Sequence, residues 1–157
     1  MYERDRNIRY SGAKYDRTIK FPHGRGLRIA FIAGKMVDHP AAVRFVLYGS
    51  FARTYHGHGT DRALVGGILG YHPDDERIRD SFEHAKEAGV EFAFEENFTD
   101  KEIYPNTVDI YVKDEKGNEM SLRGKSIGGG NAVITRLNGV DVDLNRKLQH
   151  HRCPAYR

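Results

Sequence analysis

The spacing of hydrophobic positions changes along the chain, and each change marks a different kind of element. Residues 1–26 mix charged and aromatic residues without a period, so we expect this segment to be irregular. From Leu27 onward apolar residues recur at helical spacing, which predicts a first helix that ends near residues 38–40. Residues 42–48 are β-branched and aromatic and are followed by Gly49, a pattern typical of a buried strand.

Two further helices are predicted in the middle of the chain. Thr60 or Asp61 can cap the first of them. Its interior pair Gly66-Gly67 weakens it by about 1 kcal/mol per glycine relative to alanine, which indicates close packing against a neighbour. The second helix spans residues 73–89, because a proline and three acids suit its start and a glycine suits its end.

The second half of the chain alternates apolar and polar positions with period two. This alternation predicts about four strands, near residues 92–94, 108–112, 120–122 and 133–137, with turn residues between them. The predicted order is helix, strand, two helices and then strands. Such an order favours an α+β fold with a mostly antiparallel sheet over a repeating βαβ nucleotide fold.

Length and charge refine this picture. A chain of 157 residues fits one domain, and no apolar run approaches the roughly 20 residues of a membrane span, so we expect no membrane segment and no signal peptide. The formal charge of +3 is unevenly distributed: residues 1–26 and 145–157 each carry +4, whereas residues 27–144 carry −5. Basic arms of this kind ordinarily suggest nucleic acid or an anionic surface as a partner.

The chain has a single cysteine, Cys153. One thiol forms no internal disulfide and cannot by itself build a zinc or iron–sulfur site, so any such metal chemistry must come from another chain. His150 and His151 lie beside Cys153 but lack a further anchored ligand, and we expect no metal there. The cysteine usage indicates a reducing, cytoplasmic setting.

The densest group of reactive side chains lies in the loop of residues 48–61. Glycines on both sides of His58 let the backbone approach a ligand closely, and the amides that open the next helix can hold a carboxylate or phosphate. His58 could act as a general base near neutral pH. Local pattern alone favours a plainer interpretation, a tight turn with a helix cap at Thr60 and a surface histidine. The residues that would support the loop are Ser50, Gly57, Gly59, Thr60 and Asp61.

A second candidate is the glycine-rich segment that begins at Ser126. Consecutive glycines expose backbone amides that can hold an anion, which makes Ser126, Gly128 and Gly129 candidate contacts for a substrate. The segment is not a phosphate-loop or dinucleotide fingerprint, and a β-bulge explains it equally well. His56, His72 and His84 are expected to be exposed, and no pair of them has convincing metal spacing.

Several of these segments, taken in order, resemble the beta chain of the iron–sulfur-dependent L-serine dehydratases. The resemblance covers about residues 27–144 and implies a fold similar to the allosteric substrate-binding domain of phosphoglycerate dehydrogenases. It also implies that L-serine is deaminated to pyruvate and ammonia in cytoplasmic serine catabolism and gluconeogenesis. We expect neither nucleic acid nor a membrane as a partner. The segments that carry the resemblance are residues 46–50, 57–63, 73–78, 126–130 and 138–139.

The resemblance further implies a partner. In the family an alpha chain holds a four-iron (4Fe-4S) cluster, whose open iron acts as a Lewis acid on the serine hydroxyl while a base removes the α-proton. The family's proposed base matches His58, and Asp61 and Thr60 would orient its loop. No metal ligand is expected on this chain. A non-catalytic domain that binds serine and tunes a partner enzyme is the alternative, and binding of nucleic acid through the basic arms is a third interpretation.

One segment departs from the family pattern. The family carries Gly-Pro-Ser-Ser-Ser-His-Thr-Ala-Gly close to the substrate, and a nucleotide sequence for that loop, read from its third base, encodes residues 18–26 of this chain. A nucleotide sequence that encodes residues 145–156, read from its second base, likewise encodes a polar turn and a β-branched strand. That turn and strand resemble the start of the family's C-terminal ACT domain. We therefore hypothesise that residues 1–26 and 145–157 are translated out of frame and lack packed structure, that the ACT domain is missing, and that this chain alone is inactive. Genuine but divergent ends are the alternative.

Overall fold

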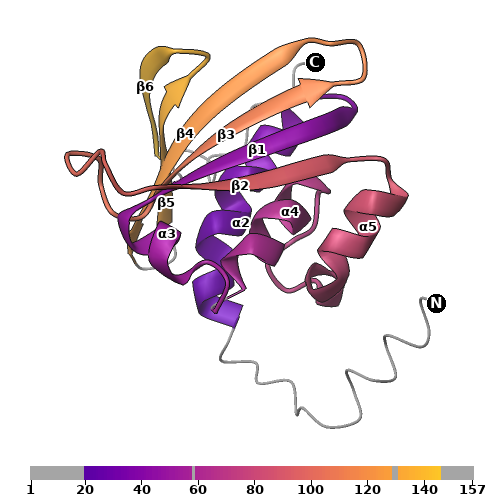
Figure 1. The fold of residues 1–157 in the computed structure, drawn as a ribbon, viewed down its shortest axis with the longest axis horizontal. Coiled ribbons are helices and arrows are strands. Elements are labelled where there is room, and N and C mark those ends of the chain that lie inside the picture. The colour runs from indigo at the N-terminus through magenta and orange to yellow at the C-terminus, as the bar shows by residue number, and fades with distance from the viewer. Residues whose placement is uncertain (1–19, 58, 129–130, 146–157) are drawn as a thin grey trace, which may run out of the picture.

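The computed structural model describes residues 20–57, 59–128 and 131–145, which form a single sheet with helices on one face (Figure 1). The helices are α2 (Lys20–Lys35), α3 (Gly49–Thr54), α4 (Thr60–Ile68), the 3-10 helix η2 (Glu76–Asp80) and α5 (Ser81–Glu87). The strands are β1 (Pro40–Tyr48), β2 (Glu91–Asn97), β3 (Thr107–Asp114), β4 (Glu119–Gly128), β5 (Asn131–Leu137) and β6 (Val140–Asn145).

The sheet has six strands in the order β2-β1-β3-β4-β5-β6. The pair β1–β2 is parallel, and the other four neighbouring pairs are antiparallel. Strand β1 therefore lies inside the sheet, where Val43 faces Phe92 on one side and Val112 on the other. The predicted α+β fold with a mostly antiparallel sheet is confirmed. Its likeness to the domain of phosphoglycerate dehydrogenases stays a prediction.

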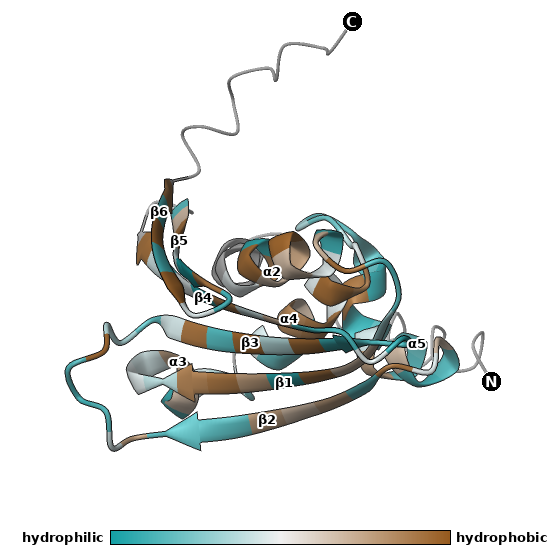
Figure 2. Cartoon of the chain, turned by 90° about the horizontal axis from the view of Figure 1, so that it is seen from above, coloured by the Kyte–Doolittle hydropathy of each residue, from teal (hydrophilic) through white to brown (hydrophobic). Residues whose placement is uncertain are grey.

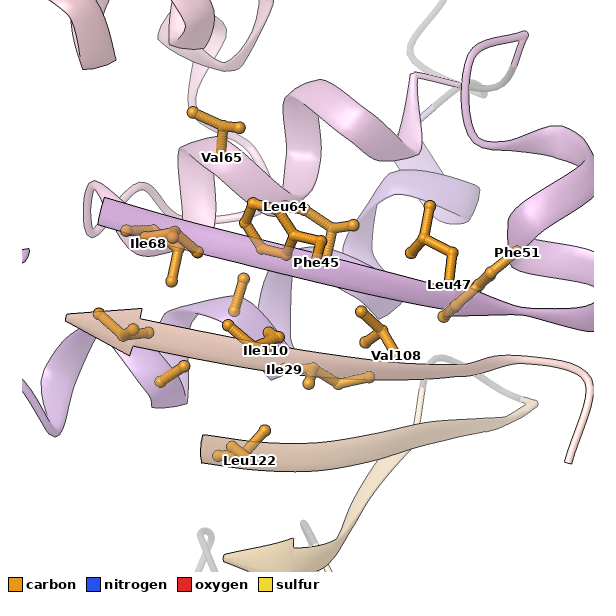
Figure 3. Packing of buried hydrophobic residues seen from close by; sticks show 14 of the residues in the cluster. Ile29, Phe45, Leu47, Phe51, Leu64, Val65, Ile68, Val108, Ile110 and Leu122 are labelled. Carbon is orange, nitrogen blue, oxygen red and sulfur yellow. The ribbon is translucent and has the colours of Figure 1, made fainter. Parts of the chain in front are cut away.

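Alternation along the strands places the core between the sheet and the helices. Phe45 of β1, Ile110 of β3 and Leu122 of β4 share one face and are fully buried (Figure 3). Ile29 of α2 and Leu64 of α4 pack on the same cluster. Figure 2 shows α2 and α4 on one side of the strands, and it shows β2 becoming hydrophilic toward its carboxyl end. Burial of this apolar face is the main stabilising term of the fold.

Helices α2 and α4 approach each other so closely that glycines are required at their contact. A Cβ atom added at Gly67 would lie 2.4 Å from the backbone oxygen of Leu27, and one added at Gly34 would lie 2.6 Å from the backbone oxygen of Ile68. The close packing predicted from the pair Gly66-Gly67 is confirmed at Gly67. At Gly66 an added Cβ would meet its nearest neighbours at 3.4 Å, an ordinary contact distance.

Helix α2 begins at Lys20, seven residues before the predicted start at Leu27. The expectation of irregular structure is therefore wrong for residues 20–26, whereas residues 1–19 lie outside the described part of the chain. Pro22 is tolerated because it falls in the first helical turn, where backbone N–H groups have no partner within the helix. Gly26 is buried, and a Cβ there would lie 3.3 Å from side-chain atoms of Thr60 and Leu64, both in α4. Tertiary packing thus outweighs the poor helix propensity of glycine.

Three other elements differ from the prediction. Residues 49–54, expected as a polar loop, form the short helix α3. The N-cap of α4 is Gly59, and neither Thr60 nor Asp61 caps the helix with its side chain. The helix predicted over 73–89 instead begins at Glu76 as η2, because the Asp75 side chain accepts a hydrogen bond from the backbone N–H of Arg77.

Beyond the predicted strands, β6 follows the Asn138-Gly139 turn as a further edge strand. Both turn residues have positive φ, +48° and +80°, as the tight hairpin turns of β-sheets require. Within the described residues, no helix combines the length and the apolar character needed to cross a membrane.

Candidate functional site

The carboxyl end of β1 is fixed by a close contact with the loop that precedes β3. Gly49 has φ of +52°, and a Cβ atom there would lie 2.6 Å from the Cα of Pro105, so only glycine fits. The backbone N–H of Phe51 then donates to the carbonyl oxygen of Pro105 at 3.3 Å. This contact holds α3, including the exposed Ser50, at the end of the sheet.

The same loop holds the second predicted segment. The backbone N–H of Ser126 donates to the carbonyl oxygen of Asn106 at 2.9 Å, one residue after Pro105. The amino-terminal half of α2 reaches this end too, since Gly26 packs on Thr60. The structure therefore brings α3 and the start of the glycine-rich segment to the same end of the molecule. Sequence reasoning missed the linking role of residues 105–106, because no local pattern marks a carbonyl that will accept a distant amide.

Backbone hydrogen bonds close the loop between α3 and α4. The N–H of Gly59 donates to the carbonyl oxygen of His56 at 3.4 Å, and the N–H of Asp61 donates to that of Tyr55 at 3.3 Å. Gly59 has φ of +69°, the left-handed conformation that glycine adopts most easily. Gly57 is exposed, and His58 lies outside the described residues, so its assignment as a base stays a prediction. The tight turn of the plainer interpretation is present, but the cap at Thr60 is not.

Asp61 is the buried charged residue of this loop, with 6% of its surface exposed. One carboxylate oxygen accepts the backbone N–H of Arg62 at 2.8 Å, and the other lies 3.2 Å from Nδ1 of His56. Asp61 also stands in the first turn of α4, where the helix dipole favours a negative charge. The contact between His56 and Asp61 was not predicted, because a spacing of five residues around a glycine turn does not specify which side chains meet.

Ser126 is fully buried, and its Oγ has no hydrogen-bond partner among the described residues. Such groups are uncommon in folded proteins. The pairing of β4 with β5 shifts register between Ser126 and Gly128, as a β-bulge or a similar irregularity does. Gly128 ends β4, whereas Gly129 lies outside the described residues. Contacts of these residues with an anion or substrate stay a prediction.

A charged cluster lies on the opposite face of the sheet near the end of β1. The Asp109 carboxylate accepts the Tyr48 hydroxyl at 2.7 Å and is bound by the Arg123 guanidinium at 2.6 and 2.7 Å. Burial, together with the hydrogen bond to Asp109, raises the pKa of Tyr48 well above its ordinary value. The hydrogen bonds to Asp109 likewise raise the pKa of Arg123. These residues pair across strands, and their spacing in the sequence carried no signal of it.

The other histidines divide into two groups. His56 and His72 are exposed, as predicted. The prediction is wrong for His84, which is 9% exposed and whose Nδ1 lies 2.8 Å from the Tyr71 hydroxyl, because the inward stripe of α5 includes it. The tract of residues 150–153 lies outside the described part of the chain. Across residues 20–57, 59–128 and 131–145, no group of three or more His, Cys, Asp or Glu side chains is arranged to hold a metal ion.

Comparisons with known proteins identify relatives of this chain by sequence. The family model for the serine dehydratase beta chain matches residues 27–136. The L-serine dehydratase beta chain of Peptoniphilus asaccharolyticus is 46% identical over 118 residues, which cover 74% of this chain and 53% of that protein. A probable L-serine dehydratase beta chain of Bacillus subtilis is 43% identical over 106 residues, which cover 68% of this chain and 47% of that protein.

A protein of Streptomyces coelicolor named L-serine dehydratase is 30% identical, over 68% of this chain and 28% of that protein. The chain thus spans about half the length of the two beta-chain relatives. The family match begins at the first residue after the departing segment 18–26 and includes both the loop of residues 49–61 and Ser126. This chain belongs to the serine dehydratase beta chain family.

Proposed function

We propose that this chain is the beta subunit of an L-serine ammonia-lyase that converts L-serine to pyruvate and ammonia together with an alpha chain. The observation that carries the proposal is that Phe51 of α3 and Ser126 both donate backbone hydrogen bonds to the carbonyl oxygens of residues 105–106. Side chains that share one rigid end of a fold can act on one substrate. Family membership supports the same activity, and the pyruvate formed would supply gluconeogenesis.

In this proposal His58 removes the α-proton of L-serine. Loss of that proton and of the β-hydroxyl as water leaves an enamine, which hydrolyses to pyruvate and ammonia. Gly57 and Gly59 allow the backbone beside His58 to approach the substrate closely. Thr60 and Asp61 are buried at the start of α4 and anchor the loop on the helix.

The 4Fe-4S cluster implied for this family does not fit the described residues of this chain. Such clusters are held by several cysteine thiolates, and the chain's one cysteine, Cys153, lies outside the described residues. We therefore propose that the alpha chain holds the cluster. In this proposal the beta chain supplies the proton acceptor.

A single substitution tests the proposal. The chain and a cluster-loaded alpha chain of a close relative are combined, and pyruvate formation and serine binding are measured for the unmodified chain and for His58→Ala. We expect the variant to lose pyruvate formation while serine binding is largely retained. A regulatory domain that only binds serine would leave turnover intact in the variant, and that result would overturn the enzymatic assignment of His58.

A further inference from the structure

The imidazole of His56 is held at two points although it lies at the surface. Its Nδ1 lies 3.2 Å from the Asp61 carboxylate, and its ring centroid lies 3.9 Å from that of Tyr55. Tyr55 is itself buried and packs on Phe94 of β2 at 5.5 Å. The side chain of His56 is 72% exposed, yet it makes both of these contacts. A freely solvated histidine would have neither restraint.

Asp61 is held at least as firmly as its partner. It lies in the first turn of α4, is buried, and accepts the backbone N–H of Arg62 with its other oxygen. The contact between His56 and Asp61 therefore links the segment just after α3 to the first turn of α4. Residues 57–60 lie between the two joined positions, and this segment contains two glycines, the residues with the greatest backbone freedom.

We propose that His56 and Asp61 form a clip that joins the two ends of the turn before α4 and restrains the backbone at Gly59 and Asp61. His56 is a positioning residue in this account: it acts through the loop and does not contact the substrate. The benefit to turnover rests on the proposed function, whereas the ordering of the loop does not. A side-chain bond across four residues suits this purpose, because the backbone bonds that close the loop are long, at 3.3 and 3.4 Å.

The clip is tested with two substitutions at one position. His56→Ala removes both contacts, whereas the side-chain amide of His56→Asn can still donate to the Asp61 carboxylate from nearly the place of Nδ1. His72→Ala is the control, because His72 is also an exposed histidine packed on an aromatic ring, at 5.2 Å from Phe31, but lies outside the loop. Hydrogen exchange of the Gly59 and Asp61 amides is measured by NMR on the full chain.

We expect exchange of these two amides to become about fivefold faster in His56→Ala, the factor that corresponds to one hydrogen bond of ordinary strength. His56→Asn should retain most of the protection, and His72→Ala all of it. Unchanged exchange in His56→Ala would overturn the clip whatever the enzymatic activity of the chain.

The enzyme combined with its alpha chain gives the second readout. His56→Ala should lower kcat about fivefold or more with little change in KM, and His56→Asn should restore most of it. Faster exchange with unchanged kcat would overturn the positioning role. Absence of pyruvate formation in the unmodified chain would instead count against the proposed function, and the exchange measurement would still decide whether the clip exists.

Discussion

Replacing Gly67 with alanine tests the close contact between α2 and α4. The added methyl group would lie 2.4 Å from the backbone oxygen of Leu27, 2.7 Å from the Cβ of Ala30 and 2.9 Å from the backbone nitrogen of Phe31. Two of these three atoms belong to the backbone, so no side-chain rotation relieves the overlap and the helices must separate. Overpacking of this kind costs about 3 kcal/mol at the upper end of its usual range. Alanine recovers about 1 kcal/mol of helix propensity, which leaves a net loss of about 2 kcal/mol.

Gly66→Ala provides a matched control one residue away in the same helix. Its added methyl group meets side-chain atoms of Ile78 and Tyr71 at 3.4 Å, so the gain in helix propensity of up to about 1 kcal/mol is retained. Urea unfolding followed by circular dichroism should separate the two variants by about 3 kcal/mol. In thermal melts Gly67→Ala should lower Tm by about 4 to 8 °C. If Gly67→Ala proved as stable as Gly66→Ala, the reasoning about this helix contact would be refuted.

Two further predictions concern charged groups. Arg123→Met should lower the free energy of unfolding by about 3 to 5 kcal/mol, because Asp109 stays buried without its ion partner. Urea unfolding measures this, and the double variant Arg123→Met with Asp109→Leu should recover much of the loss. The Arg77 side chain, by hydrogen bonding, lowers the pKa of Asp75 in the folded state. The Asp75 carboxylate therefore stabilises the fold at any pH above its unfolded pKa of about 4. This contribution is lost as the pH falls through the pKa of Asp75 in the folded state. Asp75→Asn should therefore have a lower free energy of unfolding than the unmodified chain at pH 7 but not at about pH 2. An equal difference in the free energy of unfolding at both pH values would contradict the lowered pKa of Asp75.

Periodicity and turn chemistry predicted the parts of the fold that depend on neighbouring residues. The run of β-branched and aromatic residues over 42–48 corresponds to β1, and Asn138-Gly139 forms the tight turn between β5 and β6. The glycine pair in α4 correctly indicated a close helix contact. In each case the preference of the local backbone and the burial in the fold favour the same structure.

The predictions that were wrong failed because contacts between distant segments decide the structure there. Pro22 and Gly26 are typical of a loop, yet α2 extends through them because Gly26 packs on α4. His84 lies on a charged helix but turns inward to meet Tyr71. The candidate site was predicted as two separate motifs, and their meeting point at residues 105–106 depends on the path of the whole sheet.

The position of β1 inside the sheet has a consequence for how the protein folds. Its partners Phe92 and Val112 follow Val43 by 49 and 69 residues, so β1 is synthesised long before either of its neighbouring strands. At about 5 to 20 residues per second, the ribosome needs about 3 to 14 s to reach Val112. During this time the edge of β1 that pairs with β3 has no partner strand, which is a hazard for aggregation. The strands β3 to β6 join consecutive neighbours by short turns and form early after synthesis, so we expect insertion of β1 between β2 and β3 to limit the folding rate.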